Sequence, residues 1–321
     1  MIGRAALLAR GGLLLAGMAP AAAAPLERPD AVDAAAARVE LGRRLFYEAD
    51  LSINGTMSCA TCHEQHRAFA DGNATHPGAL DDPGRRNVPG LANVGTLTRL
   101  TWADPGQDNL ERQIDTPMLG HNPVEMAMDG HTDAIAVRLG RDPCYTAMFR
   151  TAFPGENAAP DYAHAVRAIA AFERTVVSQS APWDRWRAGE RDALSQEART
   201  GAALFTKDCA GCHTGNNLTD EAYHRILPAG ADAGLMEVTG NEADRGSFRT
   251  PSLRNVALTA PYFHDGSAPD LESAIKAHAG FAAIAPASLA RLTAFLDSLT
   301  DRAFITDPAF ALPMQACGKP L

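Results

Sequence analysis

Two short motifs hold the residues with the most specific chemistry in this chain of 321 residues. Both have the pattern Cys-x-x-Cys-His, formed by Cys59, Cys62 and His63 in the first copy and by Cys209, Cys212 and His213 in the second. This pattern is the attachment signal for c-type haem. The thiols bond to the edge of the porphyrin and the histidine binds the iron, so all three groups must lie in one turn. The motifs therefore predict two covalently bound haems.

Paired cysteines have other uses, and these alternatives are a structural metal site, a disulfide and a redox-active pair. Zinc sites also use cysteine pairs, but zinc does not explain why a histidine follows both pairs at widely separated positions. A redox-active pair is typical of a βαβ unit, and alternating strand patterns are scarce in this sequence. We therefore favour haem over these alternatives.

The segments before the two motifs are similar, which indicates a duplicated module. Gly42-Arg43-Arg44-Leu45-Phe46 precedes the first motif and Gly201-Ala202-Ala203-Leu204-Phe205 precedes the second. Apolar spacing predicts helices at 35–47, 131–140, 161–178, 195–206, 269–279 and 287–299. Segments 71–124 and 214–262 are expected to form long loops that a cofactor keeps in order. The expected fold is mainly α, with two cytochrome c-like haem domains and long irregular loops.

The start of the chain has the features of a secretory signal peptide. Arg4 and Arg10 flank a short apolar stretch, and Ala22-Ala23-Ala24 offers small residues for cleavage. The apolar stretch is too short to span a bilayer. We therefore expect residues 1–24 to be removed and the mature protein to be periplasmic, without a membrane anchor.

Composition and charge exclude one class of partner. The chain has 29 Lys and Arg against 38 Asp and Glu, a formal net charge of -9, so it lacks the basic character of nucleic-acid-binding proteins. Its length suggests two domains. We expect residues 25–185 to form the N-terminal haem domain and residues 186–321 the C-terminal one, with a linker near 180–192.

Nearly the whole expected mature chain resembles the bacterial di-haem cytochrome c peroxidase and MauG family. The matching segments are Leu41–Phe46, both Cys-His motifs, Arg86-Asn87, Asn122–Met126 and, most specifically, Thr250–Gly266. Further segments are similar to the MbnH branch, whose enzyme oxidises a tryptophan of a partner protein to kynurenine; they are Leu100–Pro105, Pro117–Gly120 and Glu237–Gly240. The resemblance implies a first haem on His63 that reacts with hydrogen peroxide and a six-coordinate second haem on His213 that handles electrons.

The resemblance also implies His278 as the second axial ligand of the second haem. Cytochrome c peroxidases have a methionine at the same offset from the histidine that matches His264. Ser267 and Pro269 predict the start of a helix, and its apolar face carries His278 together with Leu271, Ala274 and Ile275. The alternative is a buried structural histidine bonded to a carbonyl. Imidazole in place of a thioether lowers a haem potential, which favours MauG-like oxidation over simple removal of peroxide.

For the peroxide site, the resemblance implies that Glu125 moves protons and that Gln113 is a second distal residue. Local sequence offers Glu125 another role, because Asn122-Pro123-Val124-Glu125 has the pattern of a capped helix start. His121 is a lesser acid-base candidate. His76 is the histidine closest to the place of a blocking ligand found in some peroxidases, but its offset does not match, so we predict no blocking histidine.

Between the haems, the resemblance implies a bridging tryptophan and a calcium ion. Trp102 matches the tryptophan, for which an ordinary core role is the alternative. The matching calcium ligands are the side chain of Asn87 and the backbone carbonyls of Thr259 and Pro261, an all-oxygen set that suits calcium. This ligand set rests on the resemblance alone.

Two pairs of residues remain open. MauG passes oxidation to its partner through a tryptophan just before its second haem motif, where this chain has Lys207-Asp208. Trp183 and Trp186 could form another exit, although packing against the second domain is the alternative. Cys144 and Cys317 are the remaining cysteines, and in an exported chain they could form a disulfide.

We interpret the chain as a periplasmic di-haem c-type oxidoreductase. Hydrogen peroxide would produce a high-valent di-haem state that oxidises an aromatic residue of a secreted partner, with a copper-binding protein as a candidate. The alternative is a di-haem cytochrome c peroxidase that reduces hydrogen peroxide to water with electrons from a cytochrome c or cupredoxin. A non-enzymatic electron carrier is a third possibility, but it leaves Glu125 without a purpose.

Overall fold

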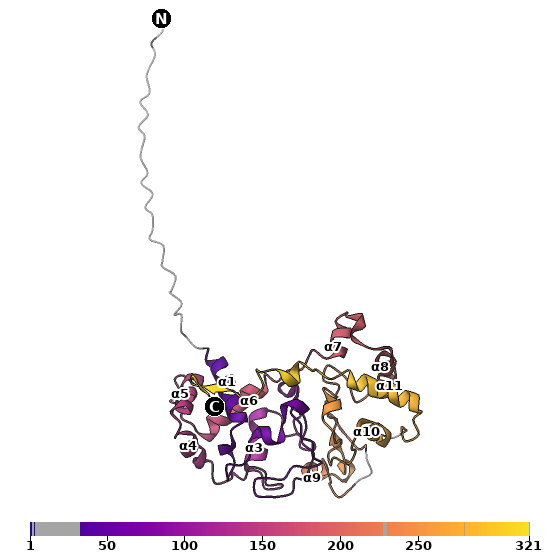
Figure 1. Ribbon diagram of the computed structural model, residues 1–321, viewed down its shortest axis with the longest axis horizontal. Coiled ribbons are helices and arrows are strands. Elements are labelled where there is room, and N and C mark those ends of the chain that lie inside the picture. The colour runs from indigo at the N-terminus through magenta and orange to yellow at the C-terminus, as the bar shows by residue number, and fades with distance from the viewer. Residues whose placement is uncertain (2, 4–32, 227–229, 279, 321) are drawn as a thin grey trace. The chain divides into compact units, whose positions relative to one another are not determined.

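Helices and long irregular segments make up the computed structural model (Figure 1), which describes residues 1, 3, 33–226, 230–278 and 280–320. Residues 33–321 form one unit. Strand structure in the described part is limited to two short antiparallel pairs, β1 (Tyr223–His224) with β2 (Phe248–Arg249) and β3 (Gln315–Ala316) with β4 (Lys319–Pro320). The mainly α class is therefore confirmed, while the predicted signal peptide lies outside the described residues apart from positions 1 and 3.

The helices differ widely in length. The longer ones are α1 (Ala34–Phe46), α3 (Leu110–Leu119), α5 (Pro143–Ala152), α6 (Tyr162–Glu173), α8 (Gln196–Asp208) and α11 (Pro286–Asp297). The shorter ones are α2 (Cys59–Cys62), α4 (Asp133–Leu139), α7 (Pro182–Arg187), α9 (Met236–Thr239) and α10 (Leu271–Ala277). Single 3-10 turns, such as η4 (Arg191–Ala193) and η7 (Phe304–Thr306), connect them.

Six of these helices match the ranges predicted from apolar spacing, but α3 and α5, together with the short α7 and α9, are absent from the prediction. Helix α3 lies inside a segment expected to be a loop, and it contains a proline, Pro117. Its N-cap Asn109 accepts a hydrogen bond from the N–H of Arg112 at 2.9 Å. Helix α5 begins with Pro143, and its N-cap Asp142 accepts from the N–H of Cys144 at 2.8 Å. Both helices also bury apolar residues at helical spacing, Leu110, Ile114 and Met118 in α3 and Tyr145, Phe149 and Ala152 in α5, so capping and periodicity together define them.

The first hydrophobic core is built around a close crossing of α1 and α6. A Cβ at Gly42 would collide with the carbonyl of Ala168, so only glycine lets the two backbones approach this closely. One turn later, Phe46 of α1 meets Phe172 of α6 with ring centroids 5.3 Å apart. The same Phe46 ring lies 6.4 Å from the ring of His63 in the first motif. The crossing therefore positions the first Cys-His turn.

The second core repeats this packing with α8 and α11. A Cβ at Gly201 would collide with the carbonyl of Arg291. Phe205 meets Phe295 with ring centroids 4.8 Å apart and lies 6.3 Å from the ring of His213. The duplication expected from the sequence is thus a repeated helix crossing, and Figure 1 shows the two helix pairs in separate places.

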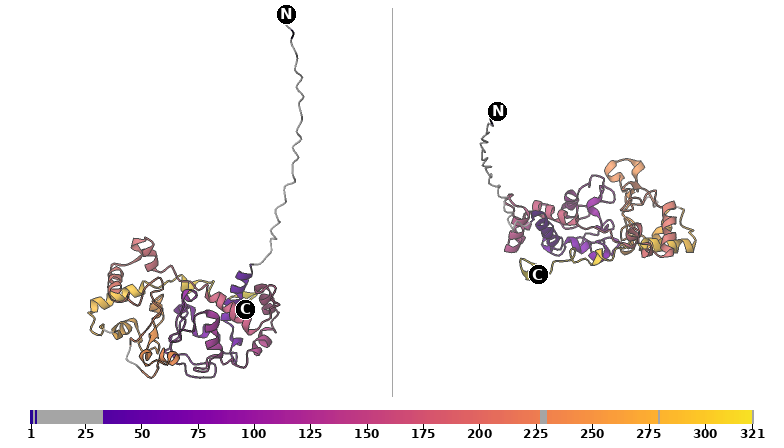
Figure 2. Two further views of the ribbon diagram at one scale, coloured as in Figure 1. Left: turned by 180° about the vertical axis from the view of Figure 1, so that it is seen from behind. Right: turned by 90° about the horizontal axis from the view of Figure 1, so that it is seen from above.

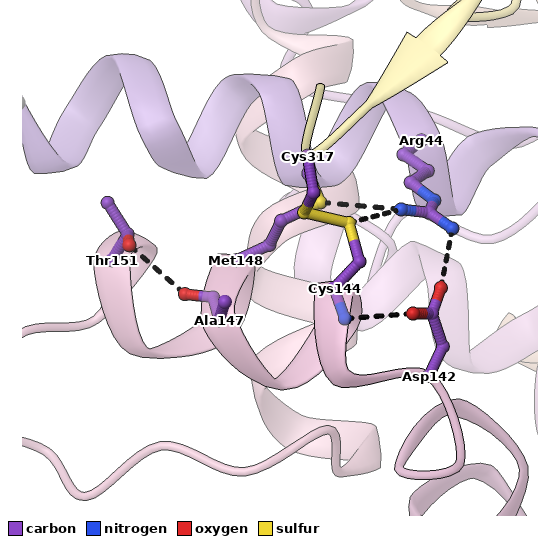
Figure 3. Close-up of a disulfide and its surroundings, with 7 residues drawn as sticks. All are labelled: Arg44, Asp142, Cys144, Ala147, Met148, Thr151 and Cys317. Atoms are coloured by element: carbon purple, nitrogen blue, oxygen red, sulfur yellow. Dashed lines mark hydrogen bonds and ion pairs between the residues drawn. A yellow bond between two sulfur atoms is a disulfide. The ribbon is translucent and has the colours of Figure 1, made fainter. Parts of the chain in front are cut away.

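The C-terminal tail packs into the first core. Phe304 and Phe310 are buried there, with ring centroids 5.7 and 6.4 Å from that of Phe69, and Figure 2 shows the C-terminal end beside the N-terminal helices. The hypothesis of a disulfide is confirmed, because Cys317 is bonded to Cys144 of α5 (Figure 3). Within the described residues, no helix has the length and apolar character needed to cross a membrane.

Replacing Gly42 with alanine should destabilise the protein, because the added methyl group enters the space of the Ala168 carbonyl. We expect the free energy of unfolding to fall by about 1–3 kcal/mol, the usual cost of overpacking. Denaturant unfolding of the haem-loaded protein measures this change. Gly230→Ala is the matched control, because a Cβ there meets nothing within 4 Å. Equal stability of the two variants would contradict the close crossing.

Candidate functional site

The first Cys-x-x-Cys-His motif forms a single helical turn at the wall of a cavity. The backbone N–H of His63 closes the turn on the carbonyl of Cys59 at 2.9 Å. The Nδ1 atom of His63 lies 2.7 Å from the carbonyl oxygen of Phe69. Because a carbonyl only accepts hydrogen bonds, Nδ1 carries the proton and Nε2 is left with the lone pair that a metal ligand needs. Cys62 and His63 line a first cavity of about 220 Å³.

The second motif repeats this arrangement at a second cavity. The N–H of His213 closes its turn on the carbonyl of Cys209 at 3.0 Å. Its Nδ1 lies 3.1 Å from the carbonyl oxygen of Leu218, which again leaves Nε2 as the ligand atom. The second cavity measures about 290 Å³ and is lined by Cys209, Cys212 and His213. Both motifs thus offer two free thiols and one oriented imidazole.

Burial sets the protonation of these groups. Loss of hydration lowers the pKa of His63, and it lowers the pKa of His213 to about 4 despite the hydrogen bond to Leu218. Both imidazoles are therefore neutral at pH 7, the form that binds metals. Burial also raises the pKa of the Cys59 and Cys62 thiols. A redox-active pair needs a lowered thiol pKa, so these shifts argue against that alternative.

His278 lies across the second cavity from His213. The centroids of the two imidazole rings are 6.4 Å apart, with the ring planes at 60°. Imidazole–metal bonds are about 2.0–2.1 Å long in zinc sites, so two imidazoles on opposite sides of one metal ion have centroids roughly 6 Å apart. The Nδ1 of His278 lies 2.8 Å from the carbonyl oxygen of Ala274, which orients this ring as the other two are oriented. The pair therefore has the spacing of two ligands on one ion.

The helix that carries His278 begins later than predicted. Helix α10 starts at Leu271, and its N-cap is Asp270, which accepts from the N–H of Ser273 at 2.7 Å. The predicted cap Ser267 is wrong, because the nearer carboxylate of Asp270 takes the free N–H groups of the first turn. The predicted apolar face is correct in direction, since Leu271, Ala274, Ile275 and His278 all line the second cavity.

Glu125 and Gln113 line the first cavity together with His63. The predicted helix start at 122–125 is wrong: this segment is irregular and contains a cis bond before Pro123. Its backbone is held by other segments instead, since the N–H of Ala79 donates to the carbonyl of Glu125 at 2.7 Å. Burial raises the pKa of the Glu125 carboxyl, and the nearby His76 partly opposes this effect. A raised pKa makes a carboxylate a stronger base, which suits a group that accepts a proton and later returns it.

Trp102 lines both cavities, so its indole lies between them. The side chain is buried, at 9% exposure, and its Nε1 donates to the carbonyl of Asn87 at 2.8 Å. The backbone carbonyl of Trp102 accepts from the N–H of Arg249 at 2.7 Å. Both ends of the residue are thus fixed between the cavities.

Several known proteins are similar to this chain in sequence over most of its length. A family model described as di-haem cytochrome c peroxidase matches residues 36–192. The methylamine utilization protein MauG of Methylorubrum extorquens is 38% identical over 244 residues, which cover 74% of this chain and 67% of MauG. Cytochrome c551 peroxidase of Nitrosomonas europaea is 34% identical over 289 residues, covering 86% of this chain and 82% of that protein. The chain belongs to the di-haem cytochrome c peroxidase family.

Solved structures agree with this membership of the family. A MauG-like protein associated with microbial copper homeostasis is 34% identical, with a TM-score of 0.82 over 87% of this chain and 93% of that one. The di-haem peroxidase BthA of Burkholderia thailandensis, at 23% identity and a TM-score of 0.69, shares the fold. As a di-haem peroxidase, the protein is an oxidoreductase that carries two haems and acts on hydrogen peroxide with a protein partner or donor.

The predicted calcium ligands all belong to the lining of one cavity. Asn87, Thr259 and Pro261 all line the second cavity. The Nδ2 of Asn87 donates to the carbonyl of Asn73 at 3.0 Å, so the amide oxygen is the atom that could bind a cation. No carboxylate belongs to this set, and calcium at this point stays a prediction.

His76 and a set of ion pairs also belong to the first cavity. The sequence offered His76 only as a candidate blocking ligand whose offset does not match, and the structure places it in the lining of this cavity together with Glu125. Arg85 and Arg86 also line it, and both bind Asp232 and Glu237. Burial would raise the pKa of Asp232, but the hydrogen bond from Arg86 holds it at about 2. These ion pairs connect segments far apart in the chain, which local patterns do not reveal. His121 is exposed and pairs with Asp129 at 3.2 Å.

Replacing His278 with methionine should change the absorption spectrum of the second haem and raise its reduction potential, because a thioether favours the reduced iron more than imidazole does. Spectroelectrochemical titration measures both changes. Lys276→Gln is the matched control, since Lys276 is exposed on the same helix and pairs with Glu272 at 3.6 Å. An unchanged spectrum and potential in the methionine variant would show that His278 is not a ligand.

Proposed function

We propose that this di-haem peroxidase oxidises an aromatic side chain of a secreted partner protein, converting tryptophan to kynurenine. One tryptophan and two molecules of hydrogen peroxide give one kynurenine, one formic acid and one water, so atoms and electrons balance. The two haems supply the redox centres that hold the oxidising equivalents. The residues of the chain orient those centres, move protons at the peroxide and connect the two cavities.

The observation that carries this proposal is the pairing of His213 with His278. The ring centroids of His213 and His278 are 6.4 Å apart, and this spacing supports a second haem with two histidine ligands. Two imidazoles stabilise oxidised iron better than an imidazole and a thioether do. Such a haem is a poor acceptor for electrons from a small donor protein, and it is well suited to sharing oxidising equivalents with the first haem.

Glu125 is proposed as the proton-transfer group of the first haem. Its place in the lining of the same cavity as His63 supports a role at bound peroxide, and its raised pKa suits a group that takes a proton from one oxygen and gives it to the other. Gln113 would donate a hydrogen bond to the peroxide from α3. Trp102 is proposed as the connection between the haems, because its buried indole touches both cavities.

A periplasmic location and a copper-binding partner belong to the same proposal. The Cys144–Cys317 disulfide supports an oxidising compartment. The MauG-like relative with 34% identity is associated with copper homeostasis, which supports a copper-binding partner. The second candidate function is a cytochrome c peroxidase that takes electrons from a cytochrome c or cupredoxin, and it is favoured by the likeness to cytochrome c551 peroxidase over 86% of the chain.

Hydrogen peroxide added to the fully oxidised protein distinguishes these functions. We expect an immediate spectral change that persists without any donor, because a second haem held by His213 and His278 would share the oxidising equivalents with the first. Adding a secreted copper-binding protein from a neighbouring gene should restore the spectrum and produce kynurenine in that protein, detected by peptide mass spectrometry.

Glu125→Gln provides the control for this experiment. Its amide cannot accept a proton, so the rate of the spectral change should fall by roughly 10²–10⁴-fold. A wild-type protein that reacts only after one haem is reduced would support the cytochrome c peroxidase instead. No reaction under either condition would contradict both functions.

The rate of reaction with peroxide should fall as the pH is lowered. Glu125 acts first as a base, so protonation inactivates it, and burial places its pKa above the ordinary carboxyl range. His76→Gln should move the midpoint of the profile to higher pH, because the positive imidazole that lowers the pKa of Glu125 is lost. Stopped-flow rates across the pH range measure both effects. A midpoint unmoved by His76→Gln would contradict this coupling.

A further inference from the structure

A row of aromatic rings leads away from the proximal histidine of the second haem. The ring of His213 lies 6.3 Å from that of Phe205, and Phe205 lies 4.8 Å from Phe295. Phe295 in turn meets Trp183 edge-on, at 5.1 Å between centroids. All of these distances are within the usual range of aromatic contacts. The row therefore connects the second Cys-His turn to α7 without a break.

The row ends in a stacked pair of indoles. Trp183 and Trp186 both lie on α7, with ring centroids 5.2 Å apart and planes only 15° from parallel. Trp183 packs on the second core, as one of the two alternatives expected from the sequence, whereas Trp186 is partly exposed between the exposed Arg185 and Arg187. Indole is one of the most easily oxidised side chains, and stacking stabilises its oxidised form further. The pair is thus an oxidisable group that extends from the core to the surface.

Helix α7 is bound to Arg254, a residue that lines the second cavity. The Nη1 of Arg254 donates to both carboxylate oxygens of Asp184, at 2.7 and 2.6 Å, and the arginine is buried. Arg254 also lines the second cavity. The N–H of Trp183 donates to the carbonyl of Ser298 at 3.1 Å. A helix of six residues gains its fixed position from these contacts, which tie it to a residue that lines the second cavity.

We infer that the Trp183–Trp186 pair passes oxidising equivalents from the second haem to a partner protein docked over α7. This inference rests on the proposed function and assigns it a surface. Each hydrogen peroxide takes up two electrons and two protons and becomes two waters. Trp186 supplies these electrons one at a time, releasing the proton of its indole N–H to solvent each time. The aromatic side chain of the partner returns an electron and a proton to Trp186.

The charges near the pair fit this step. The guanidinium of Arg191 lies 5.9 Å from the centre of the Trp186 ring, where its positive charge disfavours an indole cation. It therefore favours the neutral radical that forms when the N–H proton leaves. Phe205 and Phe295 are much harder to oxidise than indole, so they fill the space between His213 and Trp183 without holding the charge themselves.

Freeze-quench electron paramagnetic resonance of the haem-loaded full chain tests the inference, with hydrogen peroxide alone and no partner. We expect an organic radical whose line shape narrows when tryptophan is deuterated on the indole ring. Trp186→Phe should remove it, and Trp186→Tyr should replace it with a tyrosyl signal. Peptide mapping after excess peroxide should find oxidation products on Trp186 in the wild type. The chain has only 3 Trp, which makes the assignment direct.

Arg185→Gln is the matched control on the same helix, because Arg185 is exposed and pairs with Glu190 at 2.8 Å. It should keep the radical. An unchanged indole radical in Trp186→Phe would overturn the relay, and so would oxidation confined to the exposed Met314, which peroxide reaches directly. A haem spectrum that responds to peroxide without any indole radical overturns the relay alone. A haem spectrum that does not respond contradicts the proposed function, and the relay with it.

Discussion

The site depends on one recurring hydrogen bond, from the Nδ1 of a histidine to a backbone carbonyl. His63, His213 and His278 each make it, at 2.7, 3.1 and 2.8 Å. The bond fixes the tautomer and turns Nε2 toward a cavity. It works only if the carbonyls of Phe69, Leu218 and Ala274 are themselves fixed, and this is what the cores and α10 provide. The packing of the fold thus fixes the three backbone carbonyls that orient the histidines.

Two glycines make that rigidity possible. The crossings at Gly42 and Gly201 bring a helix close enough for Phe46 and Phe205 to pack beside the motif histidines. Each motif is therefore supported from behind by a tightly packed helix pair and open in front to a cavity. The repeated module provides two such supports, while the segments that line the cavities differ. Glu125 lines the first cavity and His278 lines the second.

The sequence predicted the parts of this site that depend on covalent attachment and short spacing. Both Cys-His turns, the apolar face that carries His278 and the helices on either side follow from local pattern, because each is specified within a few residues. The helix expected at 122–125 does not form, since Ala79 binds the carbonyl of Glu125 from a distant segment. The place of His76 in the first cavity and the ion pairs of Arg86 with Asp232 do not follow from the local sequence for the same reason. Contacts between loops depend on the whole fold, and neither periodicity nor capping signals them.

The packing of the C-terminal tail also constrains how the protein is made. Phe304 and Phe310 complete the core that surrounds the first motif, and Cys317 closes it covalently onto α5. The N-terminal core therefore lacks part of its interior until the very end of the chain is available. Completing this core therefore requires contacts between residues far apart in the sequence, and such contacts form more slowly than local ones.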